Sequence, residues 1–295
     1  MSHSRATGII GVGLEWLIQA WVRASRRRVD LSRETWLDGP TGNSRVGLAF
    51  YSDYARERGL CIETHGEPLG LLPDFARLAS ATFDPTVVHP EIVRFYERTS
   101  EYELDVWSHW SGLLKPFAYS LIAFVSRNIE QLNLPLSPLE TSYGMSSELV
   151  RLVDADTGEV VYAGWLRRTL SSGGIIYAGL YTTCQPPRVE SRHVKVVFPL
   201  PGGSATVLLR PEHLPDGSLN LVSDGSQYGG AGYYRLHRTG RSEAKIRLVP
   251  IKETIHVYFD RHGVLRTHHA FRFGPLPLLT LHYKLTRKPE RQASS

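Results

Sequence analysis

Two neighbouring histidines stand in a segment whose apolar and polar residues alternate. Successive side chains of an extended strand point to opposite faces. His269 therefore shares one face with Leu265, Thr267, Phe271 and Phe273, whereas His268 lies on the other face with Arg266 and Arg272. An imidazole in an apolar row suits general acid–base catalysis inside a cavity, although a core histidine with a hydrogen-bond partner would give the same pattern. Because the two rings face opposite ways, they are a poor metal pair, and we predict no metal site.

A second candidate acid lies at the start of an expected β-hairpin. Glu148 follows Gly144, Met145 and two serines and leads into an alternating apolar segment. Its register would point it inward at the mouth of a barrel, where a carboxyl group can transfer protons. We therefore predict His269 and Glu148 as catalytic residues.

Aromatic side chains with a polar tip are suited to lining a pocket. Tyr177 and Tyr181 fall on one face of an expected strand, and Trp165 and Arg167 share a face of the preceding strand. Arg167 could bind a carboxylate or polarise a carbonyl, or it could be an outward-facing strand arginine. The predicted substrate-binding residues are Trp165, Arg167, Tyr177, Tyr181, Trp107 and Phe271.

Acidic and aromatic residues are densest between Phe95 and Trp110. On a helix, Asp105 and His109 would share one face. Such a pair could orient a general base or simply stabilise the helix, and we favour the structural role. Trp107, three residues before Trp110, would then help to cap one end of the cavity.

The motifs of several enzyme classes are absent from the sequence. There is no HExxH, P-loop or GxSxG pattern, and the glycines at 8–13 lack dinucleotide-binding spacing. This argues against ATP, NAD and zinc-peptidase chemistry, and we predict no cofactor. The two cysteines, Cys61 and Cys184, form no CxxC pair. Their spacing fits a reducing compartment, so we expect a cytoplasmic protein.

The composition is that of an ordinary globular protein, with 295 residues of which 42% are apolar and 21% charged. The basic excess lies after Gly144, with 20 Lys and Arg against 12 Asp and Glu, compared with 14 against 17 before it. An anionic ligand or a solvated sheet face would explain this excess. No dense basic run carries interleaved aromatic residues, so nucleic acid is not an expected partner.

Short alternating segments punctuated by turn residues fill the chain from Met145 onward. The predicted strands are Ser147–Val153, Glu159–Arg167, Gly174–Cys184, Arg192–Phe198, Ala205–Arg210, Ser218–Val222, Gly232–Arg238, Lys245–Val249, Lys252–Asp260, Gly263–Phe273 and Leu278–Arg287. They leave no room for crossover helices, so pairing is expected to be antiparallel. The predicted fold class is α+β, mainly antiparallel β. It is either a large lipocalin-like barrel or a curved sheet of about ten strands, with helices in the N-terminal part.

Helices are expected in the first half of the chain. Pro90 suits the first turn of a helix with Ile92, Phe95 and Tyr96 on its apolar face, and a shorter helix is expected near Pro73. A broad apolar stripe over 116–132 predicts a helix that covers the sheet.

The apolar segment Gly8–Val22 is interrupted by Glu15 and Gln19 and predicts an amphipathic helix that docks on the domain. A second interpretation is weak contact of residues 8–28 with a membrane surface. The predicted divisions are an N-terminal helix and turn-rich segment (1–70), a helical cap (71–144), the barrel or sheet (145–288) and a frayed tail (289–295).

Five short phrases of the sequence resemble an uncharacterised bacterial protein family. They are Phe83-Asp84-Pro85, Phe95-Tyr96-Glu97-Arg98-Thr99, Leu104-Asp105-Val106-Trp107, Gln131-Leu132-Asn133-Leu134-Pro135-Leu136 and Phe198-Pro199-Leu200-Pro201. The resemblance covers most of the chain from about residue 70 onward. It implies no named activity and assigns no role to any residue.

These features predict a cofactor-independent enzyme that acts on an apolar small molecule inside a β-barrel cavity. Acid–base residues would promote cyclisation, isomerisation or dehydration of a molecule held in a productive geometry. The alternative is a non-catalytic carrier or binding protein for a lipid-like small molecule. A third hypothesis is an interaction module that uses residues 8–28 and the basic sheet.

Overall fold

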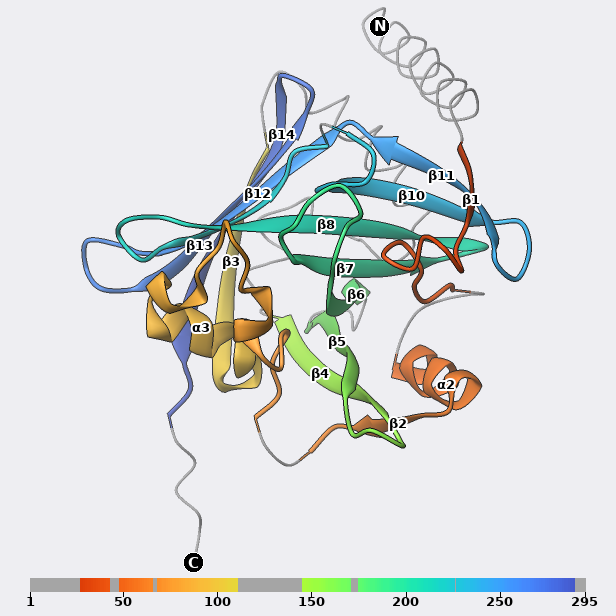
Figure 1. Cartoon of the computed structure of the whole chain (residues 1–295). Helices are drawn as coiled ribbons and strands as arrows, with labels where there is room; N and C mark the ends of the chain where they lie inside the picture. Colours follow the sequence, from red (N-terminus) through yellow and green to blue (C-terminus); the bar gives the residue numbers. More distant parts are fainter. Residues whose placement is uncertain are drawn as a thin grey trace, which may run out of the picture.

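A single curved antiparallel sheet of fourteen strands dominates the computed structural model of the chain (Figure 1). The structure describes residues 27–42, 48–65, 68–110, 145–170, 175–225 and 227–289. Its strands are β1 (Arg27–Asp30), β2 (Leu60–Glu63), β3 (Tyr102–Trp110), β4 (Met145–Asp154), β5 (Val160–Thr169), β6 (Ile175–Cys184), β7 (His193–Leu200), β8 (Gly203–His213), β9 (Leu219–Ser223), β10 (Gly232–Arg238), β11 (Glu243–Val249), β12 (Ile251–Phe259), β13 (Leu265–Phe273) and β14 (Leu276–Arg287).

The sheet branches at β8. The first part of β8, from Gly203 to Leu208, pairs with β10, and the last part, from Arg210 to His213, pairs with β9. The main path therefore has two arms, which we call the first arm (β2-β4-β5-β6-β7) and the second arm (β9-β12-β13-β14-β3), with β8 between them. A side branch of β10, β11 and β1 continues from β8. The buried residues that both arms contribute form the largest apolar core.

The prediction of a closed, lipocalin-like barrel is not confirmed. Within the described ranges, the end strand β2 pairs only with β4, and the other end strand β3 pairs only with β14. The predicted curved sheet agrees with this open path, and the mainly antiparallel α+β class is confirmed. The sheet has three strands more than the eleven predicted, because β1, β2 and β3, all from the N-terminal part, pair along its edges.

All eleven strands predicted after Met145 are present, with boundaries that differ by a few residues. The turn between β4 and β5 shows why the prediction succeeds. The Asp154 carboxylate accepts hydrogen bonds from the backbone N–H groups of Asp156 and Thr157, and Gly158 supplies a φ of +70°. Aspartate and glycine are therefore the turn residues that this geometry requires.

Two helices are described, α2 (Leu48–Arg58) and α3 (Pro90–Glu97). The second confirms the prediction, with Ile92, Phe95 and Tyr96 buried. The helix expected near Pro73 is only a 3-10 turn, Phe75–Leu78. Two further 3-10 turns cover Pro85–Val87 and Thr99–Glu101. The helix α2 was not predicted.

The helical interpretation of the segment up to Trp110 is wrong after Glu101. Residues Tyr102 to Trp110 form β3, and Tyr102 and Val106 are buried while Glu103 and Asp105 are exposed. This alternation has the period of a strand. The predicted helices at Gly8–Val22 and 116–132 and nearly all of the predicted tail lie outside the described residues. In the part of the chain that is described, no helix has the length and apolar character to cross a bilayer.

Candidate functional site

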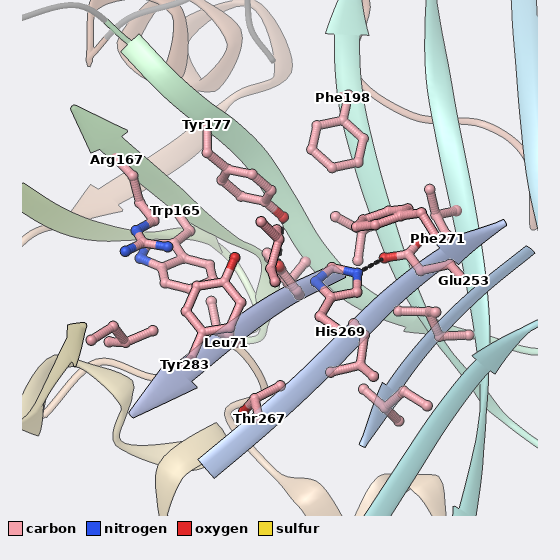
Figure 2. Close-up of a pocket in the computed structure, with 18 of the residues that line it drawn as sticks. Leu71, Trp165, Arg167, Tyr177, Phe198, Glu253, Thr267, His269, Phe271 and Tyr283 are labelled. Atoms are coloured by element: carbon pink, nitrogen blue, oxygen red, sulfur yellow. Dashed lines mark hydrogen bonds and ion pairs between the residues drawn. The ribbon is translucent and has the colours of Figure 1, made fainter. Parts of the chain in front are cut away.

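A cavity of about 200 Å³ lies between the two arms of the sheet. Its walls come from β5 to β8 and β10 on one side and from β9, β12, β13, β14 and β3 on the other. Leu71, Phe95 and Tyr96 contribute from the α3 region. Most lining residues are aliphatic or phenylalanine. Polar groups therefore stand out, and Figure 2 shows several of them directed into the same space.

One polar contact in the cavity joins a titratable base to an acid, His269 to Glu253. The imidazole Nε2 and the carboxylate Oε1 are 2.7 Å apart, and the two side chains are only 15% and 10% exposed. They come from the neighbouring strands β13 and β12, on the same face of the sheet. The ring of Phe271 packs on the imidazole with the ring centroids 4.2 Å apart.

This contact fixes the orientation of the imidazole. When Nε2 donates its proton to Glu253, Nδ1 carries a free lone pair. No hydrogen bond to Nδ1 comes from the residues that the structure describes, and Figure 2 shows this nitrogen on the side of the ring away from Glu253. A carboxylate-oriented imidazole beside an apolar space is an arrangement that can accept and return a proton.

Two tyrosines lie on the opposite wall. The hydroxyl oxygens of Tyr177 and Tyr181 are 2.5 Å apart, and the Tyr177 ring packs edge-on against Phe198 with the centroids 5.2 Å apart. Burial, with a smaller effect of the neighbouring phenol, raises the pKa of Tyr177 well above its ordinary value. Burial also raises the pKa of Tyr181. Both groups therefore remain neutral phenols that can donate a hydrogen bond.

Arg167 lies beside two aromatic rings of the cavity. Its guanidinium carbon is 5.3 Å from the Trp165 ring centroid and 5.6 Å from that of Tyr283. The residue is only 6% exposed, and its Nε is buried without a hydrogen-bond partner. The indole Nε1 of Trp165 donates to Ser147 Oγ at 2.7 Å, which holds that ring in place. In Figure 2 the side chains of Arg167 and Trp165 lie on the opposite side of the cavity from Glu253.

Six of the eight predicted site residues line this one cavity. They are Trp165, Arg167, Tyr177, Tyr181, His269 and Phe271. Strand alternation had placed each pair on one face of its own strand: Trp165 with Arg167, Tyr177 with Tyr181, and His269 with Phe271.

Glu148 and Trp107 do not line the cavity, contrary to expectation. Glu148 stands opposite Leu166 in the β4–β5 ladder, on the other face from Trp165; it is 39% exposed, and its Oε1 is 3.7 Å from Arg168 Nε. The prediction assigned Glu148 to the wrong face of β4, an error of one residue in register. Trp107 is 51% exposed and stands opposite His282 on the outer face of the second arm.

Sequence reasoning missed Glu253, Thr267 and Tyr283 as cavity residues. A usable signal for Glu253 was present, since it is the one acid in the alternating row Ile251, Glu253, Ile255, Val257 and Phe259. This is the same pattern that singled out His269. Tyr283 lies in a similar row with Leu281 and Leu285.

The described residues include no cluster of metal ligands, and the pKa of one of the two thiols is raised. No group of three or more His, Cys, Asp or Glu side chains among the described residues is arranged to hold a metal ion. Both cysteines are free thiols, and burial, the largest effect, raises the pKa of Cys184 to about 11.

Comparison with known proteins gives a relative without a described activity. The chain is 28% identical over 247 residues to the "Uncharacterized membrane protein YndJ" of Bacillus subtilis (strain 168). The match covers 83% of this chain and 42% of the relative, so the chain spans less than half of the relative's length. No protein-family model and no solved structure matches the chain. The resemblance to uncharacterised bacterial proteins is thus confirmed.

Proposed function

We propose that this chain binds a small, mostly apolar molecule between the two arms and acts on it by cofactor-independent acid–base catalysis. The observation that carries the proposal is the 2.7 Å contact between His269 and Glu253 inside an otherwise apolar cavity. A buried, oriented imidazole is the side chain best suited to move a proton near neutral pH.

The roles follow from the positions of the groups. His269 removes a proton from the bound molecule and returns it at another atom, which is the common step of isomerisation, cyclisation and dehydration. Glu253 holds the imidazole in one tautomer and stabilises its protonated form, as the carboxylate of a catalytic triad does. One of the two phenols, Tyr177 or Tyr181, donates to the other, so one O–H remains to donate to an oxygen on which negative charge develops.

The size of the cavity limits the ligand. At about 200 Å³ it is somewhat larger than an engineered apolar cavity of about 150 Å³ that binds benzene. A molecule with one ring or a chain of several carbons is the class that fits.

A carrier without catalytic activity is the second candidate. The predominance of aliphatic and phenylalanine side chains in the lining favours it. The two functions differ in one respect, since only the enzyme needs His269 for a step other than binding.

The test is native mass spectrometry of the freshly purified full chain, followed by extraction, identification of the bound molecule and assay of its turnover. We expect His269→Gln to retain the molecule and to lose about 10²- to 10⁴-fold in rate, the usual contribution of a general acid or base. The matched control is His268→Gln, on the opposite face of the same strand, which should keep the full rate. Equal rates in the two variants would overturn catalysis and leave carriage.

We also propose a reducing, cytoplasmic environment for this part of the chain. The free thiols of Cys61 and Cys184 support it.

A further inference from the structure

Among the described residues, Arg167 carries a buried guanidinium that no carboxylate neutralises. Within the described ranges, it has no carboxylate partner within salt-bridge distance, although it is 6% exposed. Two other partly buried arginines are paired with acids: Arg210 contacts Glu212 and Asp224, and Arg238 contacts Asp38. The neighbouring Arg168, on the other face of β5, lies 3.7 Å from Glu148.

A buried cation without a counter-ion is costly. Removal of a charge from water is only partly offset by aromatic rings, and a full offset requires an anion with good hydrogen-bond geometry. The Nε of Arg167 is buried and has no hydrogen-bond partner. The side chain belongs to the cavity lining, so its free donors are accessible from the cavity. The side-chain partner of this guanidinium is the neutral phenol of Tyr283, to which it is hydrogen-bonded. A buried cation with a neutral partner and no carboxylate points to a ligand that supplies the anion.

The shape of the guanidinium identifies the chemistry of that partner. Its planar fork of N–H donors matches a carboxylate, which it binds through two parallel hydrogen bonds. Trp165 and Tyr283 lie within cation–π distance and fix the plane of the group. The remainder of the cavity is mostly aliphatic and phenylalanine, which suits the apolar body of the same ligand.

We infer that the ligand is an amphipathic carboxylic acid whose carboxylate binds Arg167 and whose apolar body lies between the arms beside His269. This inference rests on the proposed function, because it requires that the cavity binds a small molecule. It adds the chemical class of that molecule and its direction in the cavity. Since Arg167 and Glu253 lie on opposite sides of the cavity in Figure 2, the reacting atoms near His269 would be remote from the carboxylate.

The test is isothermal titration of the full chain with three probes that share one apolar body, namely octanoate, 1-octanol and octylammonium. We expect octanoate to bind most tightly. Arg167→Gln should weaken octanoate by about tenfold or more, since hydrogen bonds to charged groups contribute on that scale, and should leave octanol within about twofold. The matched control is Arg168→Gln, which removes the same charge on the outer face of β5 and should leave all three affinities unchanged.

The outcomes separate the two proposals. Equal binding of octanoate and octanol, or an equal loss of octanoate binding in Arg167→Gln and Arg168→Gln, would overturn the carboxylate site and leave the apolar cavity intact. Absence of binding by all three probes would overturn both the site and the proposed function.

A second variant, Arg167→Lys, keeps the charge and removes the fork. It should weaken octanoate less than Arg167→Gln does, and circular dichroism should show that each variant is folded. If Arg167→Gln does not fold, Arg167→Lys decides alone: selective weakening of octanoate supports the site, and unchanged octanoate affinity overturns it.

Discussion

The inner and outer faces of the second arm carry the same residue types in different surroundings. On the outer face, His256, His268 and His282 stand opposite one another on β12, β13 and β14, and the last two rings are 5.0 Å apart. On the inner face, His269 contacts a carboxylate in an apolar cavity. Histidine content alone therefore says little about chemistry. The inner histidine is the candidate because a carboxylate orients it and the surroundings can exclude water.

Burial changes the pKa of two of the outer histidines. Burial is the main cause of a lowered pKa for His256 and for His282, and the nearby His268 lowers both further. These rings therefore favour the neutral form near neutral pH. His256 Nε2 lies 3.1 Å from the Ser218 hydroxyl, but no carboxylate among the described residues contacts these rings as Glu253 contacts His269.

The largest expected effect concerns Glu253. Glu253→Gln removes the charge that stabilises protonated His269 while it keeps the side chain's shape, so turnover of the identified ligand should fall by about 10²-fold or more. Steady-state kinetics checks this against Thr254→Val, a change on the outer face of the same strand. A rate within about twofold of the wild type for Glu253→Gln would remove the His269–Glu253 pair from the mechanism.

The second prediction compares aromatic residues from the two faces. Phe198→Ala, in the cavity wall, should lower the free energy of unfolding by about 3 kcal/mol, because Phe198 is buried and packs on Tyr177. Trp107→Ala, on the exposed face, should change it by less than about 0.5 kcal/mol. Urea unfolding measures both. Similar losses would mean that the outer face is covered in the native protein.

The third prediction concerns His193 on β7, a fully buried imidazole away from the cavity lining. Burial is the main cause that lowers its pKa to about 4 from 6.5. The unfolded chain then binds more protons than the native one between these pH values, so stability falls as the pH falls through this window. From pH 7 to pH 5 the loss attributable to His193 should be about 2 kcal/mol.

Urea unfolding at the two pH values, compared with His193→Gln, isolates this contribution. The variant should show a smaller loss between pH 7 and pH 5 by about that amount. His268→Gln should retain the full loss. An identical pH dependence in wild type and His193→Gln would show that the native state does not lower the pKa of His193 below its unfolded value.

The smallest effect is expected for the stability of the free protein after removal of Arg167. Arg167→Met removes a buried cation without a carboxylate partner, so the melting temperature should stay unchanged or rise by a few degrees. Arg168→Met, which breaks a half-buried ion pair at 3.7 Å, should change stability by less than about 1 kcal/mol. A clear loss of stability in Arg167→Met would indicate that the arginine serves the fold.

Much of the sheet and of the cavity could be predicted because both depend on local patterns. Alternation and turn residues identified the strands from Met145 onward, and alternation also placed His269 and Arg167 on the faces that line the cavity. Glu253 carried the same signal and was overlooked.

The errors have physical causes of two kinds. Glu148 fails because its face was assigned one residue out of register, since the next residue, Leu149, is the one that packs with Trp165. Trp107 fails because its segment was assigned a helical period. Barrel closure and the pairing of β3 with β14 depend on contacts between distant segments, which local patterns do not encode.

The most direct test of the central claim is a crystal structure of the full chain with bound 8-bromooctanoate, with the bromine located by its anomalous scattering. The account predicts bromine density between the two arms, with the carboxylate bound by Arg167 and the chain passing His269. Bromine density only on the outer surface, with the space between the arms filled by protein side chains, would contradict it.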